Sequence, residues 1–403
     1  MKIVIVSSSD CGGAGIAALR LHKALLAYGV DSSMLCLHKT TNEEKVYAFH
    51  KSILTKVIEH LPIPYRQNKY KKFYNDLSKC YECFSFPEAV FDISNHPLIQ
   101  NADIVNLHWI GNMLNYPLFF SKVKKPIVWT LHDRNPFLGI AHLFGDRDKN
   151  IQYKKLESQV HRLKENAIHK HHNLTVVNLC GWMKEYSSIS STFKNYNHVI
   201  IPNSIDTSIF RVYDRNAIRT LLDIPLDKPV FMFACQNVNN AWKGFDILIN
   251  AIKHVQKDCY YLVIGSKKSL TLNQDNIKFL GTIKDEKLMA LIYSACNAFL
   301  LPTREDNLPN TMVEALCCGV PVISFTNGGM KNTITSMFNG ILVDTMDEAH
   351  FAAAINTFIE NMGTFDQDAI SKDAISKFNP RIQAQNYVDL FSKILDKNKK
   401  INS

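Results

Sequence analysis

The chain has 403 residues, of which 46% are hydrophobic and 21% are charged. This length exceeds what one hydrophobic core usually supports, and the composition excludes a disordered or fibrous chain, so we expect two packed domains. The formal net charge of +9 lies in residues 1–200, where 25 Lys and Arg face 16 acids, because residues 201–403 carry 21 of each sign. The basic N-terminal half therefore predicts an anionic partner.

The N-terminus begins with a short strand pattern, Met1-Lys2-Ile3-Val4-Ile5-Val6, and lacks the features of a signal peptide. No run approaches the roughly 20 apolar residues of a membrane-spanning helix. We therefore expect a cytoplasmic protein whose ten cysteines are thiols. Cys80 and Cys83 offer two metal ligands where a structural zinc needs about four, so we expect no metal, and no feature predicts a nucleic-acid partner.

Residues 51–72 form a basic segment with a single acid, Glu59, and interleaved apolar and aromatic side chains. Its basic residues are Lys51, Lys56, Arg66, Lys69, Lys71 and Lys72. Such a segment suits peripheral binding to the anionic inner face of the plasma membrane. A solvated surface helix and loop explains it equally well, so the pattern leaves both interpretations open.

The first half of the chain alternates strand patterns with helical ones. We predict a helix over 14–28 and strands over 3–7, 33–37, 104–108 and 126–130. This alternation is typical of a parallel sheet wound with helices. A Gly-rich turn at Asp10-Cys11-Gly12-Gly13-Ala14 follows the first strand and would let the backbone approach a phosphate. A dinucleotide-binding dehydrogenase would need a different glycine spacing and an acid after the second strand.

A second alternation begins near residue 228. We predict strands over 230–235, 260–264 and 298–302, and helices over 245–255 and 284–295. We therefore expect two Rossmann-like parallel-sheet domains, residues 1–206 and 207–380, followed by a C-terminal helix and tail over 381–403 that packs back on the N-terminal domain. Ligands bind beyond the carboxyl ends of parallel strands, so we expect the chemistry in a cleft that the two domains face.

Residues 302–323 run from a strand end through a polar loop into a helix beginning near Thr311, which Gly319 ends. Loop amides and the helix dipole at this point would hold phosphate or sugar oxygens, and we expect Asn310 to cap the helix. We expect Glu314 just inside the first turn of this helix, where helix electrostatics explains an acid equally well. Lys243 also precedes a helix, where a cation opposes the dipole, so a bound anion is the better explanation.

This segment resembles the signature of retaining glycosyltransferase family 4, of the GT-B fold, in which seven residues separate two acids, as they separate Asp306 from Glu314. The resemblance implies that Asp306 contacts the donor sugar, that the amides of 307–311 cradle sugar and phosphate, and that Glu314 holds the ribose hydroxyls. Asp306 replaces the usual Glu, and Glu305 is an alternative partner.

Asn240-Ala241-Trp242-Lys243-Gly244 resembles the family element whose lysine meets the donor diphosphate. The arginine common several residues before that lysine is absent, so one diphosphate contact must be missing or supplied elsewhere.

Two further segments carry the resemblance. Residues 130–137 with Gly139 resemble the Thr-Leu-His-Asp element of transferases that build bacterial surface polysaccharides, which implies that His132 faces donor sugar and acceptor with Asp133 alongside. Pro202-Asn203-Ser204-Ile205-Asp206 resembles the turn at the domain junction, with Ser204 in place of the common Gly. For His108, at the end of another strand, a structural role is the preferred interpretation. The resemblance spans residues 1 to about 345.

The resemblance and the residue patterns together give one set of site residues. The predicted catalytic residues are Lys243, His132, Asp306 and Glu314. The predicted donor-binding residues are Gly13, Ala14, Gln236, Lys243, Gly244, Ile283, Asn307, Leu308, Pro309, Asn310, Thr311 and Glu314. The predicted acceptor and cleft residues are His108, Asp133 and Asn203.

The predicted activity is hexosyl transfer with retention, without metal or cofactor. A hexose or N-acetylhexosamine would move from a nucleotide-sugar, most simply a UDP-sugar, to a polyprenyl-linked or other lipid-linked oligosaccharide in surface-polysaccharide (lipopolysaccharide, O-antigen, capsule or exopolysaccharide) biosynthesis. Two alternatives stay open: a nucleotide-sugar epimerase of the same fold, and a non-catalytic glycan-binding or scaffold subunit, which the missing arginine and Asp306 suggest.

Overall fold

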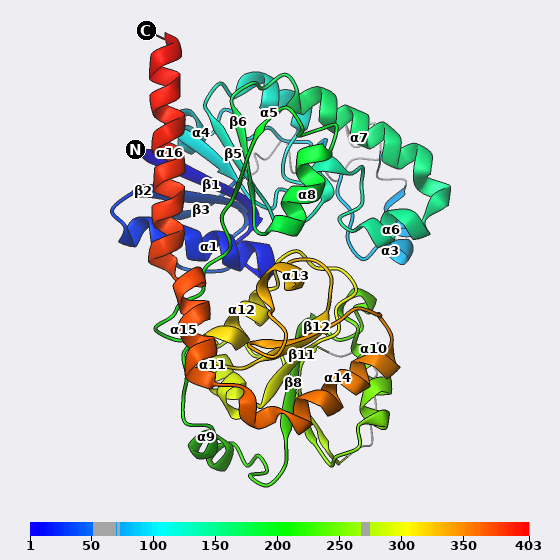
Figure 1. Ribbon diagram of the computed structural model, residues 1–403. Helices are drawn as coiled ribbons and strands as arrows, with labels where there is room; N and C mark the ends of the chain where they lie inside the picture. The colour runs from blue at the N-terminus through cyan, green and yellow to red at the C-terminus, as the bar shows by residue number, and fades with distance from the viewer. Residues whose placement is uncertain (51–69, 71–72, 267–274, 403) are drawn as a thin grey trace. The chain divides into compact units, whose positions relative to one another are not determined.

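The computed structural model describes residues 1–50, 70, 73–266 and 275–402. It divides into two compact units, unit 1 (Met1–Pro202 with Gln383–Ser403) and unit 2 (Asn203–Ile382), each built on its own sheet (Figure 1). The basic residues of the segment 51–72 lie outside the described residues, so its predicted membrane role is not tested by the structure.

Unit 1 is built on a parallel sheet that, within its described residues, has seven strands in the order β3-β2-β1-β4-β5-β6-β7. The strands are β1 (Lys2–Ser9), β2 (Asp31–His38), β3 (Val46–Ala48), β4 (Ile104–Leu107), β5 (Ile127–Leu131), β6 (Leu174–Asn178) and β7 (Asn197–Ile200). Its helices are α1 (Gly12–Ala27), α3 (Tyr74–Cys80), α4 (Pro97–Gln100), α5 (Tyr116–Lys122), η3 (Asn135–Phe137), α6 (Phe144–Lys149), η4 (Ile151–Tyr153), α7 (Lys154–Ile168), α8 (Gly181–Ile189) and α16 (Pro380–Asn402).

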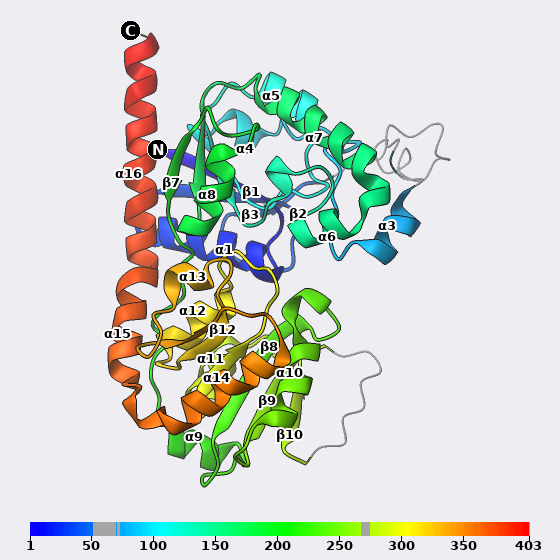
Figure 2. The same ribbon diagram turned by 45° about the vertical axis from the view of Figure 1, so that its right-hand side comes forward.

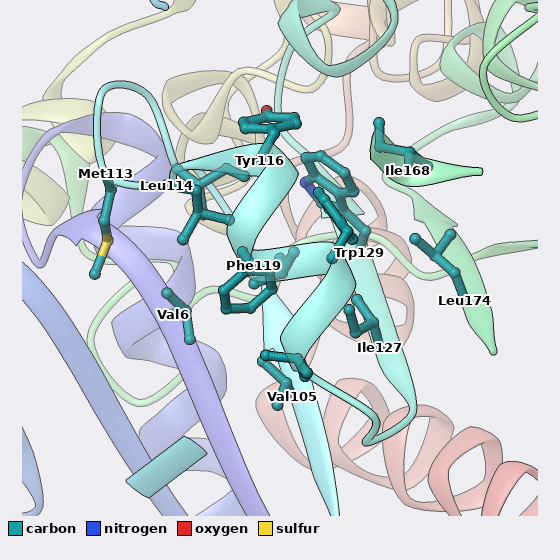
Figure 3. Close-up of a cluster of buried hydrophobic side chains, with 14 of the residues drawn as sticks. Val6, Val105, Met113, Leu114, Tyr116, Phe119, Ile127, Trp129, Ile168 and Leu174 are labelled. Atoms are coloured by element: carbon teal, nitrogen blue, oxygen red, sulfur yellow. The ribbon is translucent and has the colours of Figure 1, made fainter. Parts of the chain in front are cut away.

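Both faces of this sheet are buried, because its strands are apolar at successive positions. Ile3 and Ile5 belong to a cluster with α1 and α16, while Val4 and Val6 belong to one with α5, α7 and α8. The second cluster surrounds Trp129, whose ring packs against Tyr116 and Phe120 (Figure 3). Continuous apolar runs of this kind are expected of parallel strands covered on both sides. Figure 2 shows α16 along one side of unit 1 and α5 and α7 along the other.

The C-terminal helix α16 therefore belongs to the core of unit 1 from Gln383 onward. Tyr387 is fully buried, and its hydroxyl lies 2.9 Å from Thr130 Oγ1 on β5. Gln383 also donates to the carbonyl of Pro202, at 2.9 Å. The helix thus covers part of a sheet face that the first 202 residues do not cover by themselves.

Unit 2 repeats the architecture with parallel strands, six in its described residues, in the order β10-β9-β8-β11-β12-β13. The strands are β8 (Val230–Asn237), β9 (Tyr260–Ser266), β10 (Ile277–Gly281), β11 (Ala298–Leu301), β12 (Val322–Phe325) and β13 (Gly340–Val343). The helices are α9 (Arg215–Leu221), η5 (Ala241–Lys243), α10 (Phe245–Ala251), η6 (Ile252–His254), α11 (Glu286–Ala295), α12 (Asn310–Cys317), α13 (Met330–Thr333), α14 (Glu348–Glu360), η7 (Met362–Thr364) and α15 (Gln367–Phe378). One sheet face packs under α10 and α14.

The predicted α/β class and parallel sheets are confirmed, and the predicted strands match β1, β2, β4, β5, β8, β9 and β11. The helix predicted over 245–255 is α10 only as far as Ala251, after which the chain tightens into η6. Within the described residues, none of the helices combines the length and the apolar character needed to span a membrane.

Candidate active site

Lys243 lies where the connection from β8 meets α10, and its backbone is tightly fixed. Asn240 caps the short helix η5 by accepting from the amide of Trp242 at 2.9 Å. Gly244 follows with φ 72°, and a Cβ there would stand 1.9 Å from the carbonyl oxygen of Pro302. Only glycine fits such a left-handed residue against another backbone. Lys243 is thereby held against the loop that leaves β11.

That loop, residues 302–309, carries Asp306. Its backbone and side chains bind the β8 connection, since Thr303 Oγ1 and the amide of Arg304 both donate to the carbonyl of Trp242, at 2.9 and 2.8 Å. Lys243 Nζ lies 2.6 Å from Asp306 Oδ2, with side chains 35% and 18% exposed. Two predicted catalytic residues, 63 positions apart in the chain, therefore form an accessible ion pair at the carboxyl edge of the sheet.

Arg304 adds a second cation beside Lys243, and sequence reasoning missed it. Its guanidinium binds both oxygens of Asp246, at 2.8 and 2.5 Å, and the carbonyl of Ala241. This pairing holds the pKa of Asp246 below its ordinary value. The sequence has no arginine in the residues just before Lys243, whereas the fold brings one from the β11 loop.

A turn after β12 supports the same loop from a third segment. Asn327 Nδ2 donates to the carbonyls of Thr303 and Arg304, at 3.0 Å each. The amide of Gly329 donates to the carbonyl of Asn307, and a Cβ on Gly328 or Gly329 would stand 1.8 or 2.1 Å from a loop carbonyl oxygen. The Asn-Gly-Gly sequence directly after a strand was the available signal for this contact.

Helix α12 begins one residue earlier than predicted. Its N-cap is Pro309, so Asn310 is the first helical residue and the expected capping role is wrong. The extended backbone of Pro309, with ψ 124°, already ends the loop there. The side chain of Asn310 instead accepts from Asn203 Nδ2 at 3.1 Å. Neighbouring loop residues Leu308 and Asn307 are buried.

Glu314 lies in the second turn of α12, and no acid occupies the first turn, so dipole electrostatics does not explain it. Its side chain is largely buried, with the residue 8% exposed, and Tyr293 Oη donates to Oε2 at 3.2 Å. A carboxylate held this way costs desolvation energy that a structural acid would avoid at the surface. Its contact with the ribose hydroxyls remains a prediction.

Three remaining predicted donor residues lie at or near the same edge. Gln236, the penultimate residue of β8, is exposed, and its backbone carbonyl accepts from Ser266 Oγ at 2.8 Å. Ile283 is half-buried in the connection from β10 to α11, and Thr311 is half-buried in the first turn of α12. Their predicted contacts with a donor remain predictions.

In unit 1 the Gly-rich turn is shorter than predicted, because α1 already begins at Gly12. Gly13 and Ala14 thus lie in the first helical turn, not in a loop. Gly15 packs closely, since a Cβ there would stand 2.6 Å from the carbonyl oxygen of Ser9. The N-terminus of α1 is therefore tightly packed against the end of β1.

Asp10, just before that helix, is anchored by the segment that follows β2. Its carboxylate accepts from the amides and hydroxyls of Thr40 and Thr41, at 2.8–2.9 Å. Burial raises the pKa of Asp10, but these hydrogen bonds outweigh it and hold the pKa below its ordinary value. Asp10 is consequently a structural carboxylate of the turn.

His108 and His132 follow the neighbouring strands β4 and β5, and their rings meet. His108 Nδ1 lies 2.8 Å from His132 Nε2. Burial lowers the pKa of His132 to about 4 and the pKa of His108 well below its ordinary value. Both rings are therefore neutral at physiological pH.

Asp133 belongs to a different pair, with a histidine that sequence reasoning missed. His142 Nδ1 lies 2.6 Å from Asp133 Oδ2, which also accepts from Trp109 Nε1 at 2.6 Å. Ser85 Oγ contacts the other ring nitrogen of His142 at 2.8 Å. Burial lowers the pKa of His142, but the charge and hydrogen bond of Asp133, together with those of Cys83, outweigh burial and raise it to about 10. An imidazolium–carboxylate pair thus adjoins the neutral His108–His132 pair.

Helix α7 holds the segment that links Asp133 to His142. Lys164 Nζ, fully buried, donates to the carbonyls of Asn135 and Gly139 and to Asn135 Oδ1, at 2.6–2.9 Å. Glu157, two turns earlier on the same face of α7, accepts from the amides of Ile140 and Ala141, at 2.7 and 3.1 Å. Two buried ionisable side chains of α7 thus hold the backbone of this loop in one conformation.

The part of the chain that the structure describes brings no three His, Cys, Asp or Glu side chains together in a way that could hold a metal ion. The groups described above at the carboxyl edges of the two sheets are ammonium, carboxylate, imidazole and amide groups, which bind anions and hydroxyls.

Comparison with known proteins decides the class of this chemistry. Residues 228–361 match the family model described as Glycosyl transferases group 1. Residues 228–361 thus form a group 1 glycosyltransferase domain. A D-inositol 3-phosphate glycosyltransferase from Xylanimonas cellulosilytica is 21% identical over 375 residues, covering 88% of this chain and 85% of that protein. The predicted enzyme class, glycosyltransferase, is thus confirmed.

Two solved structures share the fold of this glycosyltransferase. Sucrose-phosphate synthase from Thermosynechococcus elongatus matches with a TM-score of 0.70 at 16% identity, covering 98% of this chain and all 100% of that one. HepE from Anabaena, in complex with UDP-glucose, matches with a TM-score of 0.67 at 15% identity, with coverage of 98% and 100%. The predicted GT-B fold is confirmed by these matches.

Proposed function

We propose that this glycosyltransferase moves a hexose or N-acetylhexosamine from a UDP-sugar to a lipid-linked oligosaccharide, with retention of the anomeric configuration. The observation that carries the proposal is the accessible Lys243–Asp306 pair, 2.6 Å apart on two interlocked loops at the carboxyl edge of the unit 2 sheet. An ammonium there suits a diphosphate leaving group. UDP-glucose in the HepE structure, which has the same fold, supports the choice of donor base.

Lys243 would stabilise the negative charge that develops on the diphosphate as the sugar departs. A fixed cation aimed at developing charge is the strongest single catalytic device available without a metal. Asp306 lies beside Lys243 and within the loop whose amides follow, so it would meet the donor sugar while orienting the ammonium. Glu314, held by Tyr293, would accept from the ribose hydroxyls.

Unit 1 would bind the acceptor. Its 1–200 segment has nine more basic than acidic residues, 25 against 16, which suits an acceptor that carries phosphate. His132 and Asp133, which follow β5, are the residues we assign to acceptor and donor sugar, and His108, which follows β4, lies behind His132. A phosphate-linked lipid carrier would place the enzyme in the cytoplasm, peripherally on the inner membrane face, in surface-polysaccharide assembly.

A second acceptor deserves a direct test, because the relative from Xylanimonas is named for D-inositol 3-phosphate. Both candidate acceptors carry phosphate, and they differ in size and in the lipid. A nucleotide-sugar epimerase would need no acceptor, and a scaffold subunit would release no nucleotide.

The test measures nucleotide release from UDP-, GDP- and ADP-sugars with three acceptors: polyprenyl-diphosphate-linked oligosaccharide, inositol 3-phosphate, and none. We expect release from a UDP-sugar with the lipid-linked acceptor only, and a loss of roughly 100-fold or more in Lys243→Ala, as for removal of a transition-state charge partner. Lys253→Ala, on the exposed surface beyond α10, is the matched control. Nucleotide release with inositol 3-phosphate would make that compound the acceptor in place of the lipid-linked oligosaccharide. Isomerised UDP-sugar formed without an acceptor would indicate the epimerase. Failure to bind any of the donors would refute the proposal.

A further inference from the structure

The contact between His108 and His132 has a geometry that fixes where the protons lie. β4 and β5 pair in parallel through Leu107 and Trp129, so the next position pairs His108 with Thr130. His132 stands two residues beyond Thr130, directly after the end of β5 at Leu131. The two rings approach to 2.8 Å between Nδ1 of His108 and Nε2 of His132.

His108 is rigidly held at this place. Its amide donates to the carbonyl of Val6 on β1 at 2.9 Å, which extends the sheet by one residue beyond β4. The residue is only 3% exposed. Its second ring nitrogen, Nε2, is buried and has no hydrogen-bond partner among the described residues. The ring therefore makes one polar contact, and that contact is His132.

Two neutral arrangements satisfy the short distance. In the first, His108 donates from Nδ1 and its buried Nε2 is a bare lone pair. In the second, His132 donates from Nε2, and His108 must carry its own proton on the buried, unpartnered Nε2. Buried N–H groups without an acceptor are rarer in proteins than buried acceptors without a donor, since the lost hydrogen bond to water is costly. The first arrangement is favoured.

We propose that His108 is a positioning residue that donates its Nδ1 proton to Nε2 of His132 and so holds His132 as the neutral tautomer protonated on Nδ1. The catalytic meaning rests on the proposed function, in which His132 meets the sugar substrates. Because Nε2 of His132 is occupied as an acceptor, His132 cannot remove a proton through that nitrogen. It takes part in the reaction with a fixed ring orientation, and not as a base at Nε2.

The neighbouring charges agree with this arrangement. Asp133, the nearest carboxylate along the chain, is already paired with the His142 imidazolium and the Trp109 indole. It therefore does not need a proton from His132. The cationic ring of the region is His142, and the His108–His132 pair stays neutral beside it.

The primary test is nuclear magnetic resonance of the full-length protein with ¹⁵N-labelled histidine at pH 7. The His132 signals among the 15 histidines are assigned by their loss in His132→Asn. We expect wild-type His132 to be protonated on Nδ1 and unprotonated on Nε2. A proton on Nε2, or on both nitrogens, would overturn the proposal, and this readout does not depend on any activity.

Two variants separate positioning from simple packing. His108→Asn places an amide N–H near the position of Nδ1 and should keep the His132 tautomer, while His108→Leu should release it to the Nε2-protonated form. With a transfer assay, His108→Leu should lower kcat roughly 10- to 100-fold with little change in KM, the range seen when a partner orienting a functional histidine is removed, and His108→Asn should recover most of it.

His22→Asn controls for loss of a buried histidine elsewhere in unit 1, where the ring contacts Ser32. An unchanged tautomer in His108→Leu would refute the positioning role even if transfer is lost. A failure of the enzyme to transfer sugar at all would leave the tautomer result standing, so the two proposals fail separately.

Discussion

The buried pair of His142 and Asp133 gives the most quantitative prediction for unit 1. Replacing His142 by Gln keeps a polar side chain of similar reach but removes the positive charge that Asp133 and Trp109 surround. Asp133 then lacks its cation and keeps only neutral donors. Removing one partner of a buried ion pair typically costs about 3–5 kcal/mol.

The size of the effect can be worked from the pKa of His142. The difference between the ordinary pKa of 6.5 and the value of about 10 in the folded protein, at about 1.4 kcal/mol per pH unit, corresponds to about 5 kcal/mol as an upper figure. The folded state binds the proton more tightly than the unfolded state, so this stability is fully present below pH 6.5. It is lost as the pH rises through 10.

We therefore expect His142→Gln to lower the unfolding free energy of unit 1 by about 3–5 kcal/mol at pH 6 and by much less at pH 10. The measurement is urea unfolding between pH 6 and 10, followed by Trp fluorescence, since Trp109, Trp129 and Trp182 belong to unit 1 and only Trp242 to unit 2. The exposed His172→Gln is the matched control. A destabilisation that stays constant or grows with pH would refute the reasoning.

Three further predictions concern other buried groups. Burial lowers the pKa of Lys164 to about 7, so at this site the unfolded state binds more protons between pH 7 and 10.5. The unfolding free energy of wild type minus that of Lys164→Met should therefore rise over that range in the same urea series. The same slope of unfolding free energy against pH in Lys164→Met and in wild type would contradict this. Gly329→Ala brings a Cβ to 2.1 Å from the Asn307 carbonyl, so we expect at least about a 10-fold weaker Kd for UDP by calorimetry, corresponding to about 1.4 kcal/mol; Gly363→Ala, with open space around it, should bind normally, and equal Kd values in both variants would exclude the loop-support role. Tyr293→Phe removes the hydroxyl that donates to Glu314 and should lower the unfolding free energy of unit 2 by about 1–3 kcal/mol, read from Trp242 fluorescence; Tyr260→Phe is the control, and no difference between the two would show that this hydrogen bond contributes nothing.

Local sequence determined the architecture because local rules suffice for it. Alternating strand and helix patterns placed β1, β2, β4 and β5 in unit 1 and β8, β9 and β11 in unit 2, since a parallel sheet covered on both faces needs continuous apolar runs. The boundaries were less exact, as Asn310 shows. One residue decides between capping a helix and beginning it, and the backbone of Pro309 settled that choice.

Within the site, the sequence identified residues by type and motif, and the structure decided their partners. Lys243 and Asp306 were predicted separately, and only the tight approach of Gly244 to Pro302 makes them one ion pair. Their roles in catalysis remain predictions. Arg304 and the Asn327–Gly329 turn were missed because each acts on a loop from a different strand, and sequence spacing does not record that.

The histidines show the same division most clearly. Sequence placed His108 and His132 at strand ends but gave no reason to join them, and it had no signal for His142 as the partner of Asp133. Strand order decides the first contact, since β4 and β5 are neighbours although 19 residues separate Leu107 from Ile127. The loop after β5, held by Lys164 and Glu157 of α7, decides the second. Residue type fixes which ionisable groups are available, and packing fixes which of them meet. Burial and the distances between the groups then set the pKa of each one.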